Sequence, residues 1–478
     1  MSYSTDTLQV PQNHHTKEAS MADSLTDFRS LPSKSSDQLL NMDSRSTLRL
    51  TMLKTKNEQR GSEGGLKAWL TVIGAWLVMF STFGYLYSFG VYQDFYTRFF
   101  LSTHSPGKIA WIGSFQLMMP FAFGVLSGKL FDMGYFHLLE IFGSSIFVIS
   151  LFMLSLARPQ VYSDVFLSQA LGMGVGLGLT FIPTIGIVTH HFERQKVLAT
   201  GIVMSGSSLG AVVFPISTLI LLLRPVRLSD SVFFVYNLIA SYGFEKTVQA
   251  SAYIVLGLLF IANCLMRTAY TNASAEKPKP DIKTFFTDIP YMLGSLGALV
   301  AMFGFYFPLI YLQLYSVLHG VDTNLAFYSI AIINAASTVG RVLGNYIAHH
   351  YGAFNVGVTC TLITAASVFA VFGVHDSTSL ILVSLFHGLF AGAWLSVSVA
   401  ALGTLSRHPH EVGARIGIAL AISSFGSLGA APVQGALLES TYEWNRPIAF
   451  SGVLLVVASF IFLLARTILS KERSTWKV

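Results

Sequence analysis

Twelve apolar stretches, each long enough to cross a lipid bilayer, dominate this sequence between residues 68 and 469. The hydrocarbon core of a bilayer is about 30 Å thick, and a helix needs about 20 apolar residues to cross it. Lipid offers the backbone no hydrogen-bond partner, so a chain crosses it as helices or as a closed barrel. We therefore expect an all-α integral membrane fold of twelve helices, with spans at 68–93, 108–130, 137–157, 164–189, 197–222, 248–269, 289–316, 324–348, 354–374, 379–404, 412–438 and 447–469.

The composition excludes an ordinary soluble enzyme. Only 11% of the 478 residues are charged, whereas 53% are hydrophobic; a soluble domain carries about 25% charged residues. The two cysteines, Cys264 and Cys360, both lie in apolar stretches. They suggest neither a disulfide framework nor a cysteine-based metal site. The net charge of +6 is spread over loops and tail, so we expect no nucleic-acid partner.

Polar segments divide the chain. Residues 1–62 are rich in Ser, Thr, Asp, Gln and Asn and predict a disordered cytoplasmic tail, which is either a solvated leader or a target of phosphorylation. Residues 270–288, with their Lys and Pro, predict a cytoplasmic linker. The linker would join a six-helix half at 63–269 to a second at 289–470, and 471–478 would be a short cytoplasmic tail.

The basic residues predict the orientation of the spans. If both termini are cytoplasmic, 22 of the 30 Lys and Arg fall on the cytoplasmic side and seven in outer loops. Cytoplasmic loops of membrane proteins carry such an excess of positive charge. We therefore expect a multi-pass protein with both termini in the cytoplasm, in the plasma membrane rather than the vacuolar membrane.

Two short patterns repeat between the halves. The sequence Ser-Leu-Gly-Ala at 208–211 recurs at 427–430, a shift of 219 residues. The pair Gly124-x-x-x-Gly128 recurs as Gly340-x-x-x-Gly344, a shift of 216 residues. Similar shifts predict two six-helix halves related by pseudo-two-fold symmetry. Related halves around a site near the bilayer midplane are typical of carriers that work by alternating access.

Three motifs resemble those of a known family. The loop Gly128-Lys-Leu-Phe-Asp132-Met-Gly resembles a loop motif of the major facilitator superfamily, although Met133 stands where arginine is usual. The segments at 63–69 and 192–201 resemble two signatures of its monocarboxylate porter family, in the fungal branch. The resemblance extends over about residues 63–470. It implies a secondary or facilitative transporter of a monocarboxylate or related organic anion, and we expect the transport unit to be a monomer.

The sequence departs from that family in two places. In proton-coupled members a lysine in span 1 and an aspartate in span 8 take part in coupling, and here Tyr87 and Ser337 occupy the matching positions. The acidic residues, Glu140 among them, are predicted near span ends. Two modes of transport therefore remain: uniport or exchange without proton coupling, or proton coupling through His387. Residues 219–237 form an insert that is either an outer loop or a retained intron.

Arg341 is the leading candidate for substrate binding. A charged side chain at the centre of a bilayer costs about 2.5–3.5 kcal/mol on insertion scales, and a guanidinium can bind a carboxylate through two parallel hydrogen bonds. The alternative is that Arg341 pins a neighbouring helix. Three tyrosines and one histidine are further candidates, each with a packing role as its alternative: Tyr87, Tyr306, Tyr311 and His387.

Four residues are candidates for a cytoplasmic gate, because the loop motif of the superfamily stabilises one conformation: Gly128, Asp132, Arg194 and Lys196. We find no catalytic or nucleotide-binding motif, so we expect no enzyme activity, cofactor or metal. The expected partners are a small organic anion and the lipid bilayer. Three alternatives remain open: a carrier of another solute class, such as a vitamin or a secreted secondary metabolite, an integral-membrane enzyme, and a non-transporting receptor.

Overall fold

The computed structural model describes residues 65–192, 195–217, 234–268, 281–408, 411–438 and 443–478. These residues form helices and connecting loops and contain no β-strand. They include 12 helical spans long and apolar enough to cross a membrane. The predicted all-α membrane fold is confirmed. The predicted tail at 1–62, Arg194 and most of the insert and the linker lie outside the described residues.

The first half contains spans 1 to 6, and several of these are broken into shorter helices. Span 2 consists of α4 and α5, which meet at Phe123. Span 6 crosses at Phe244–Leu265, a few residues earlier than predicted, because helix continues through the charged pair Glu245 and Lys246. The elements are α2 (Leu66–Tyr87), α3 (Phe89–Phe95), η1 (Tyr96–Phe100), α4 (Pro106–Ala122), α5 (Gly124–Asp132), α6 (Phe136–Ser155), α7 (Tyr162–Val165), η2 (Phe166–Gly172), α8 (Met173–Gly186), η3 (Ile187–His190), α9 (Lys196–Ser217) and α10 (Phe234–Leu265).

The second half contains spans 7 to 12, and side-chain caps fix where two of its long helices begin. Asp322 accepts a hydrogen bond from the backbone N–H of Leu325, 2.9 Å away, and Asp376 accepts one from Ser379, 3.0 Å away. These caps satisfy N–H groups that a first helical turn leaves unpaired. The elements are α11 (Ile282–Phe285), α12 (Ile289–Phe305), α13 (Phe307–Leu318), α14 (Thr323–Tyr351), α15 (Ala353–Phe369), η5 (Ala370–Gly373), α16 (Ser377–Thr404), α17 (Val412–Leu438) and α18 (Asn445–Glu472).

Glycines allow the helices to approach closely. A Cβ atom added to Gly84 on α2 would lie 2.6 Å from the Cα of Gly210 on α9. One added to Gly344 on α14 would lie 2.6 Å from the Cβ of Ala393 on α16. Both distances are too short for two carbon atoms, so any side chain at Gly84 or Gly344 would force the helices apart. The repeated small-residue pattern therefore marks helix–helix contacts, as small residues do in other membrane proteins.

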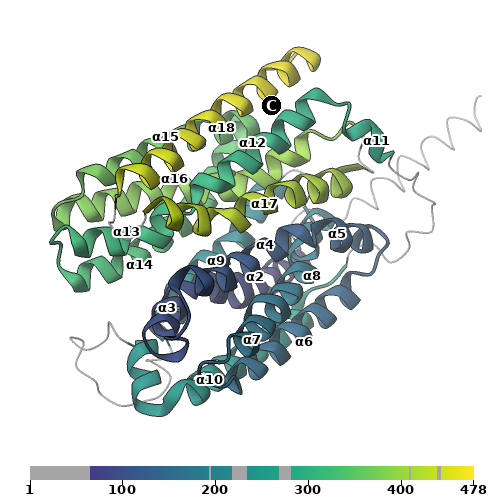
Figure 1. The fold of residues 1–478 in the computed structure, drawn as a ribbon. Coiled ribbons are helices and arrows are strands. Elements are labelled where there is room, and N and C mark those ends of the chain that lie inside the picture. The colour runs from purple at the N-terminus through teal and green to yellow at the C-terminus, as the bar shows by residue number, and fades with distance from the viewer. Residues whose placement is uncertain (1–64, 193–194, 218–233, 269–280, 409–410, 439–442) are drawn as a thin grey trace, which may run out of the picture. The chain divides into compact units, whose positions relative to one another are not determined.

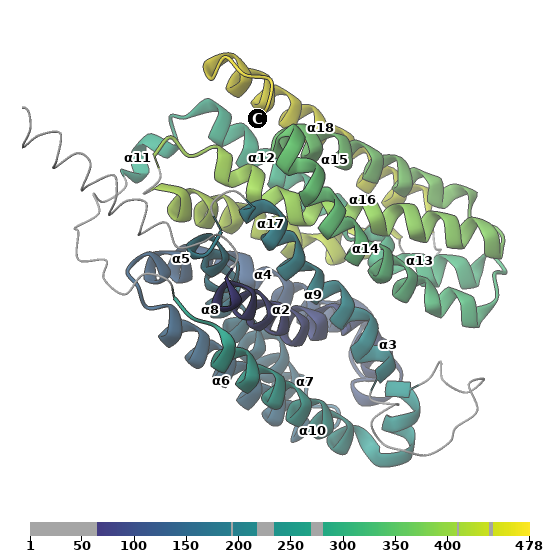
Figure 2. The same cartoon turned by 180° about the vertical axis from the view of Figure 1, so that it is seen from behind.

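The two halves are distinct within residues 63–478, which form one compact unit. Figure 1 shows the helices of the first half, purple to teal, gathered together, with those of the second half, green to yellow, beside them. The view from behind in Figure 2 shows the same division. The most extensive contacts between halves join α9 to α14, and α4 and α5 to α17. Arg341 on α14 and Asp132 on α5 belong to helices that make this contact.

Candidate functional site

Two small neighbouring cavities lie between the halves. Both are lined by Tyr87 on α2, Arg341 on α14 and Leu395 on α16. The cavity volumes are ≈ 10 Å³ and ≈ 20 Å³, room for about one water molecule each. The site is therefore closed in this conformation, and an organic solute enters only when the halves move apart.

Arg341 lies between the two cavities. It is the nineteenth residue of the 29-residue helix α14, and only 3% of its surface is exposed. Its Nη1 donates to the backbone oxygen of Met204 on α9 (3.3 Å), and its Nε donates to Ser337 Oγ (3.4 Å). Among the described residues, no ion pair joins Arg341 to a carboxylate. Because no carboxylate among the described residues pairs with it, this buried cation is able to bind an anion.

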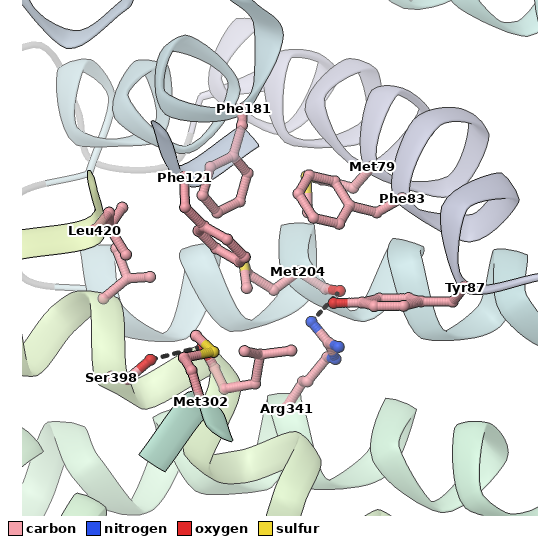
Figure 3. Close-up of a pocket in the computed structure, with 12 residues that line it drawn as sticks. Met79, Phe83, Tyr87, Phe121, Phe181, Met204, Met302, Arg341, Ser398 and Leu420 are labelled. Atoms are coloured by element: carbon pink, nitrogen blue, oxygen red, sulfur yellow. Dashed lines mark hydrogen bonds between the residues drawn. The ribbon is translucent and has the colours of Figure 1, made fainter. Parts of the chain in front are cut away.

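The first cavity is apolar apart from Arg341, Tyr87 and Ser398. In Figure 3 the rings of three phenylalanines face it from the first half, and Arg341 points toward Tyr87 and Met204. Methionine and phenylalanine side chains adapt to apolar ligands of irregular shape. The apolar residues that line this cavity are Met79, Phe83, Phe121, Phe181, Met204, Met302, Leu395, Val399 and Leu420.

The second cavity is more polar and is enclosed mainly by the second half. Its polar lining consists of Tyr87, Asn334, Ser337, Arg341 and His387. Tyr87 and Ser337, the positions that the sequence analysis matched to a coupling lysine and aspartate, both line this cavity with Arg341. His387 is fully buried, and its Nδ1 lies 3.0 Å from Ser367 Oγ on α15.

The other two candidate tyrosines take different positions. Tyr306 lies between α12 and α13, buried, with its hydroxyl 3.8 Å from the sulfur of Met302. It is near Tyr87 and Arg341 but lines neither cavity. Tyr311 donates to the backbone oxygen of Ala431 on α17 (3.3 Å) and also lines neither cavity. In this conformation Tyr87 and His387 share a cavity with Arg341, and these two tyrosines do not.

The candidate gate lies where α5 meets the beginning of α17. A Cβ added to Gly128 would lie 3.5 Å from Gly413 O, and one added to Gly413 would lie 2.5 Å from an oxygen of Asp132. The Asp132 carboxylate thus sits against the first turn of α17, where the helix dipole favours negative charge. Lys196 begins α9 and is exposed, and Arg194 lies outside the described residues.

A buried ion-pair cluster joins α12 to α17, and our sequence analysis did not identify it. Arg415 on α17 is 1% exposed and donates to Asp288 (2.6 Å) and to Glu411 (3.1 Å). Arg407 also donates to Asp288 (3.0 Å). Burial raises the pKa of Asp288, but the hydrogen bonds from Arg407 and Arg415 outweigh it and hold that pKa below its usual value. Oppositely charged residues at the same predicted membrane face were the only available sequence signal.

The burial of Glu140 is a second feature that the sequence analysis did not predict. It lies near the beginning of α6, as predicted, but none of its side chain is exposed. Thr184 on α8 donates to its Oε1 (2.7 Å), and its Oε2 has no hydrogen-bond partner among the described residues. Position near the end of a span therefore did not imply contact with water.

The described part of the chain contains no group of three or more His, Cys, Asp or Glu side chains that could hold a metal ion. Twelve spans in two halves, with a closed site containing a buried cation between them, are the architecture of a membrane carrier. Comparison with known proteins identifies the family of carriers to which the chain belongs. The model of the Major Facilitator Superfamily matches residues 68–372 and 337–476. The chain belongs to this superfamily, and it is a membrane transporter and not an enzyme.

Two similar proteins are named for efflux. The Aspyridones efflux protein apdF of Emericella nidulans is 32% identical over 406 residues, covering 85% of this chain and 79% of that protein. The Agnestins efflux protein AgnL12 of Paecilomyces divaricatus is 33% identical over 401 residues, covering 84% and 87%. These names give no support to monocarboxylate specificity.

A solved structure shares the fold. A variant of the E. coli fucose:proton symporter FucP aligns with a TM-score of 0.62 at 14% identity, over 84% of this chain and 98% of that one. At that identity the likeness concerns the fold alone.

Proposed function

We propose that this protein exports an organic acid with an apolar body, a secondary metabolite, by alternating access. The observation that carries the proposal is Arg341, a buried guanidinium between the halves with no carboxylate partner among the described residues. Burying an unpaired charge is costly, and the substrate would supply the missing negative group. Both halves contact the arginine, so rocking of one half against the other exposes it to each side in turn.

The lining of the first cavity favours an apolar body over a short monocarboxylate. Phe83, Phe121 and Phe181 face the cavity from the first half, and Met302 and Leu420 face it from the second. A two- or three-carbon acid would leave these side chains without contacts when the site closes around it. A short monocarboxylate, the substrate class that the family resemblance implies, is the second candidate.

The direction of transport rests on similar proteins that are named as efflux proteins, apdF and AgnL12 among them. Export from a cell requires the plasma membrane, and both termini would face the cytoplasm because the basic residues concentrate on that side. Tyr87 and Ser337 replace the family's coupling residues beside Arg341. We therefore propose uniport or exchange rather than proton-driven accumulation.

Binding to the purified full-length protein tests the substrate class. The probes are 3-phenylpropanoate, its amide 3-phenylpropanamide, and propanoate, measured by isothermal titration in detergent. We expect 3-phenylpropanoate to bind at least tenfold more tightly than either the amide or propanoate, because only 3-phenylpropanoate has both the charge and the apolar body. Preference for propanoate would support the short monocarboxylate. Equal binding of the acid and the amide would overturn the role of Arg341.

A further inference from the structure

His387 presents a buried ring nitrogen that lacks a partner. The residue is 0% exposed, and His387 is among the residues that line the second cavity together with Arg341. Its Nδ1 points to Ser367 on α15, whereas its Nε2 has no hydrogen-bond partner among the described residues. Leaving a buried polar atom unpaired is unfavourable. An unpaired buried nitrogen on a residue that lines the cavity therefore suggests a ligand group that pairs with it.

The hydrogen bonds around Ser367 determine which nitrogen carries the proton. Ser367 Oγ donates its hydrogen to the backbone oxygen of Thr364, 2.7 Å away. A hydroxyl has only one hydrogen to give, so in its contact with Nδ1 of His387 it accepts. Nδ1 therefore bears the N–H. A neutral imidazole has one N–H, which leaves Nε2 as a bare acceptor.

The cavity does not favour a charged imidazole. Its described lining contains no carboxylate, and it already contains the Arg341 guanidinium. A second positive charge there would be buried without a counter-ion, which is strongly unfavourable. The neutral form, with Nε2 as acceptor, is the one that fits.

We propose that Nε2 of His387 accepts a hydrogen bond from a hydroxyl group that the substrate carries close to its acidic group. This inference rests on the proposed function, because it takes Arg341 as the anchor of the acid. Arg341 and His387 line the same cavity, and Arg341 also lines the apolar cavity. The substrate class narrows from an organic acid to a hydroxy acid with an apolar body.

The tautomer makes this site selective. A hydroxyl can donate to Nε2, whereas a methyl ether at the same position has no hydrogen and places an oxygen lone pair against a nitrogen lone pair. Ser367 acts as a positioning residue, because it holds the proton on Nδ1. Without it the ring can adopt the other tautomer, in which Nε2–H donates to an ether oxygen.

A matched ligand series tests the inference on the purified full-length protein. The probes are 3-phenyllactate, its O-methyl ether and 3-phenylpropanoate, which differ only at the carbon beside the carboxylate. Isothermal titration gives a Kd for each, and the readout is the ratio of Kd values within one protein. We expect 3-phenyllactate to bind about tenfold more tightly than 3-phenylpropanoate, and the ether to bind more weakly than both.

Two variants identify the residues responsible. His387→Phe should bring the ratio between 3-phenyllactate and 3-phenylpropanoate close to one, because a phenyl ring fills similar space without an acceptor. Ser367→Ala should raise the relative affinity for the ether, a change that a merely structural role of Ser367 would not produce. Thermal unfolding with 3-phenylpropanoate present verifies that each variant is folded.

The outcomes separate this inference from the proposed function. A hydroxyl preference lost in His387→Phe supports it. If wild type binds 3-phenylpropanoate in preference to its amide but gains nothing from the hydroxyl, the inference fails and the proposed function stands. If His387→Phe still binds 3-phenyllactate more tightly than 3-phenylpropanoate, the inference about His387 is also overturned. If none of the acids binds, the proposed function fails and this inference with it.

Discussion

At the scale of single residues, the site combines a cation from α14 with a hydroxyl from α2 and an imidazole from α16. Arg341 contacts Met204 of the other half directly, so its environment changes whenever the halves separate. Its planar guanidinium offers five N–H donors in fixed directions, whereas lysine offers a single point charge. Recognition of an acid here therefore depends on the shape of the donor group as well as on its charge.

Replacing Arg341 should remove recognition of the acid. Arg341→Ala should weaken binding of 3-phenylpropanoate about 10- to 100-fold, since a charged hydrogen bond contributes about 1.5–3 kcal/mol. Arg341→Lys should restore it only in part. Titration of both variants, beside 3-phenylpropanamide as a ligand that does not need the cation, measures the effect. An alanine variant that still prefers the acid would exclude the anchor.

At the scale of elements, α17 is held from two sides. Its first turn lies against Asp132 of α5 in the other half. Two residues after Gly413, Arg415 bonds Asp288 before α12 and Glu411 before α17. The Arg415 guanidinium also lies 4.5 Å from the centre of the Phe285 ring. The cluster fixes α17 to its own half, so that α17 and α12 would move together when the gate opens.

The Asp288 cluster should contribute stability that depends on pH. The folded-state pKa of Asp288 is lowered, so its contribution is present above the unfolded value of about 3.9 and is lost as pH falls through the folded pKa. Asp288→Asn breaks a buried pair, which costs about 3–5 kcal/mol. The Tm of the variant should lie below that of wild type at pH 7, and the gap should narrow below about pH 4.

Thermal unfolding in detergent between pH 3 and pH 8 measures that gap. Asp164→Asn is a matched control, because Asp164 pairs with Arg158 at the surface, 2.9 Å away, with the arginine largely exposed. An exposed pair contributes only about 0–1 kcal/mol, so the control should show a small gap at every pH. A Tm difference for Asp288→Asn that stays constant down to pH 3 would contradict the assignment.

At the scale of the whole molecule, two of the close contacts between the halves lie toward the end predicted to face the cytoplasm. One joins Asp132 to Gly413, and the other joins α9 to α14, where a Cβ added to Gly201 would lie 2.7 Å from the Cβ of Asn345. Separation of the halves at that end would break both contacts. Alternating access therefore requires that these pairs be broken once in each cycle.

Locking one of these contacts should stop transport. With Cys264 and Cys360 replaced by serine, Asp132→Cys together with Gly413→Cys should form a disulfide on oxidation, because the Gly413 Cβ position lies 3.1 Å from Asp132 Cγ. Exchange of 3-phenylpropanoate across liposomes should fall more than tenfold and return on reduction. The two single-cysteine variants control for the loss of Asp132. If the cross-linked protein exchanges as fast as the same protein after its disulfide has been reduced, the halves do not need to separate at this point.

Exchange should also be insensitive to a proton gradient once ionisation of the acid is accounted for. Tyr87 and Ser337 beside Arg341 do not titrate near neutral pH, and His387 fits as a neutral acceptor. Accumulation of 3-phenylpropanoate in liposomes with and without an imposed gradient measures this. Gradient-driven accumulation that is lost in His387→Gln would assign coupling to His387, and accumulation that survives in this variant would direct attention to the buried Glu140.

The sequence determined by itself the number and the approximate positions of the spans, and it predicted that Arg341 is a charge within a span. Both follow from local properties, since lipid selects long apolar stretches for helices and makes a charge within one conspicuous. It also predicted close packing at Gly344, because small residues at four-residue spacing share one face of a helix.

Only the tertiary structure decided which polar groups meet. Asp288 and Arg415 are 127 residues apart, and Ser208 and Ser337, which lie 2.9 Å apart across the two halves, are separated by 129. Whether Tyr87, rather than Tyr306 or Tyr311, reaches the cavities depends on how each helix is rotated against its neighbours. The partner of His387 Nδ1 is Ser367, a residue of another helix. Such contacts arise from the packing of whole helices, which hydropathy along one helix does not specify.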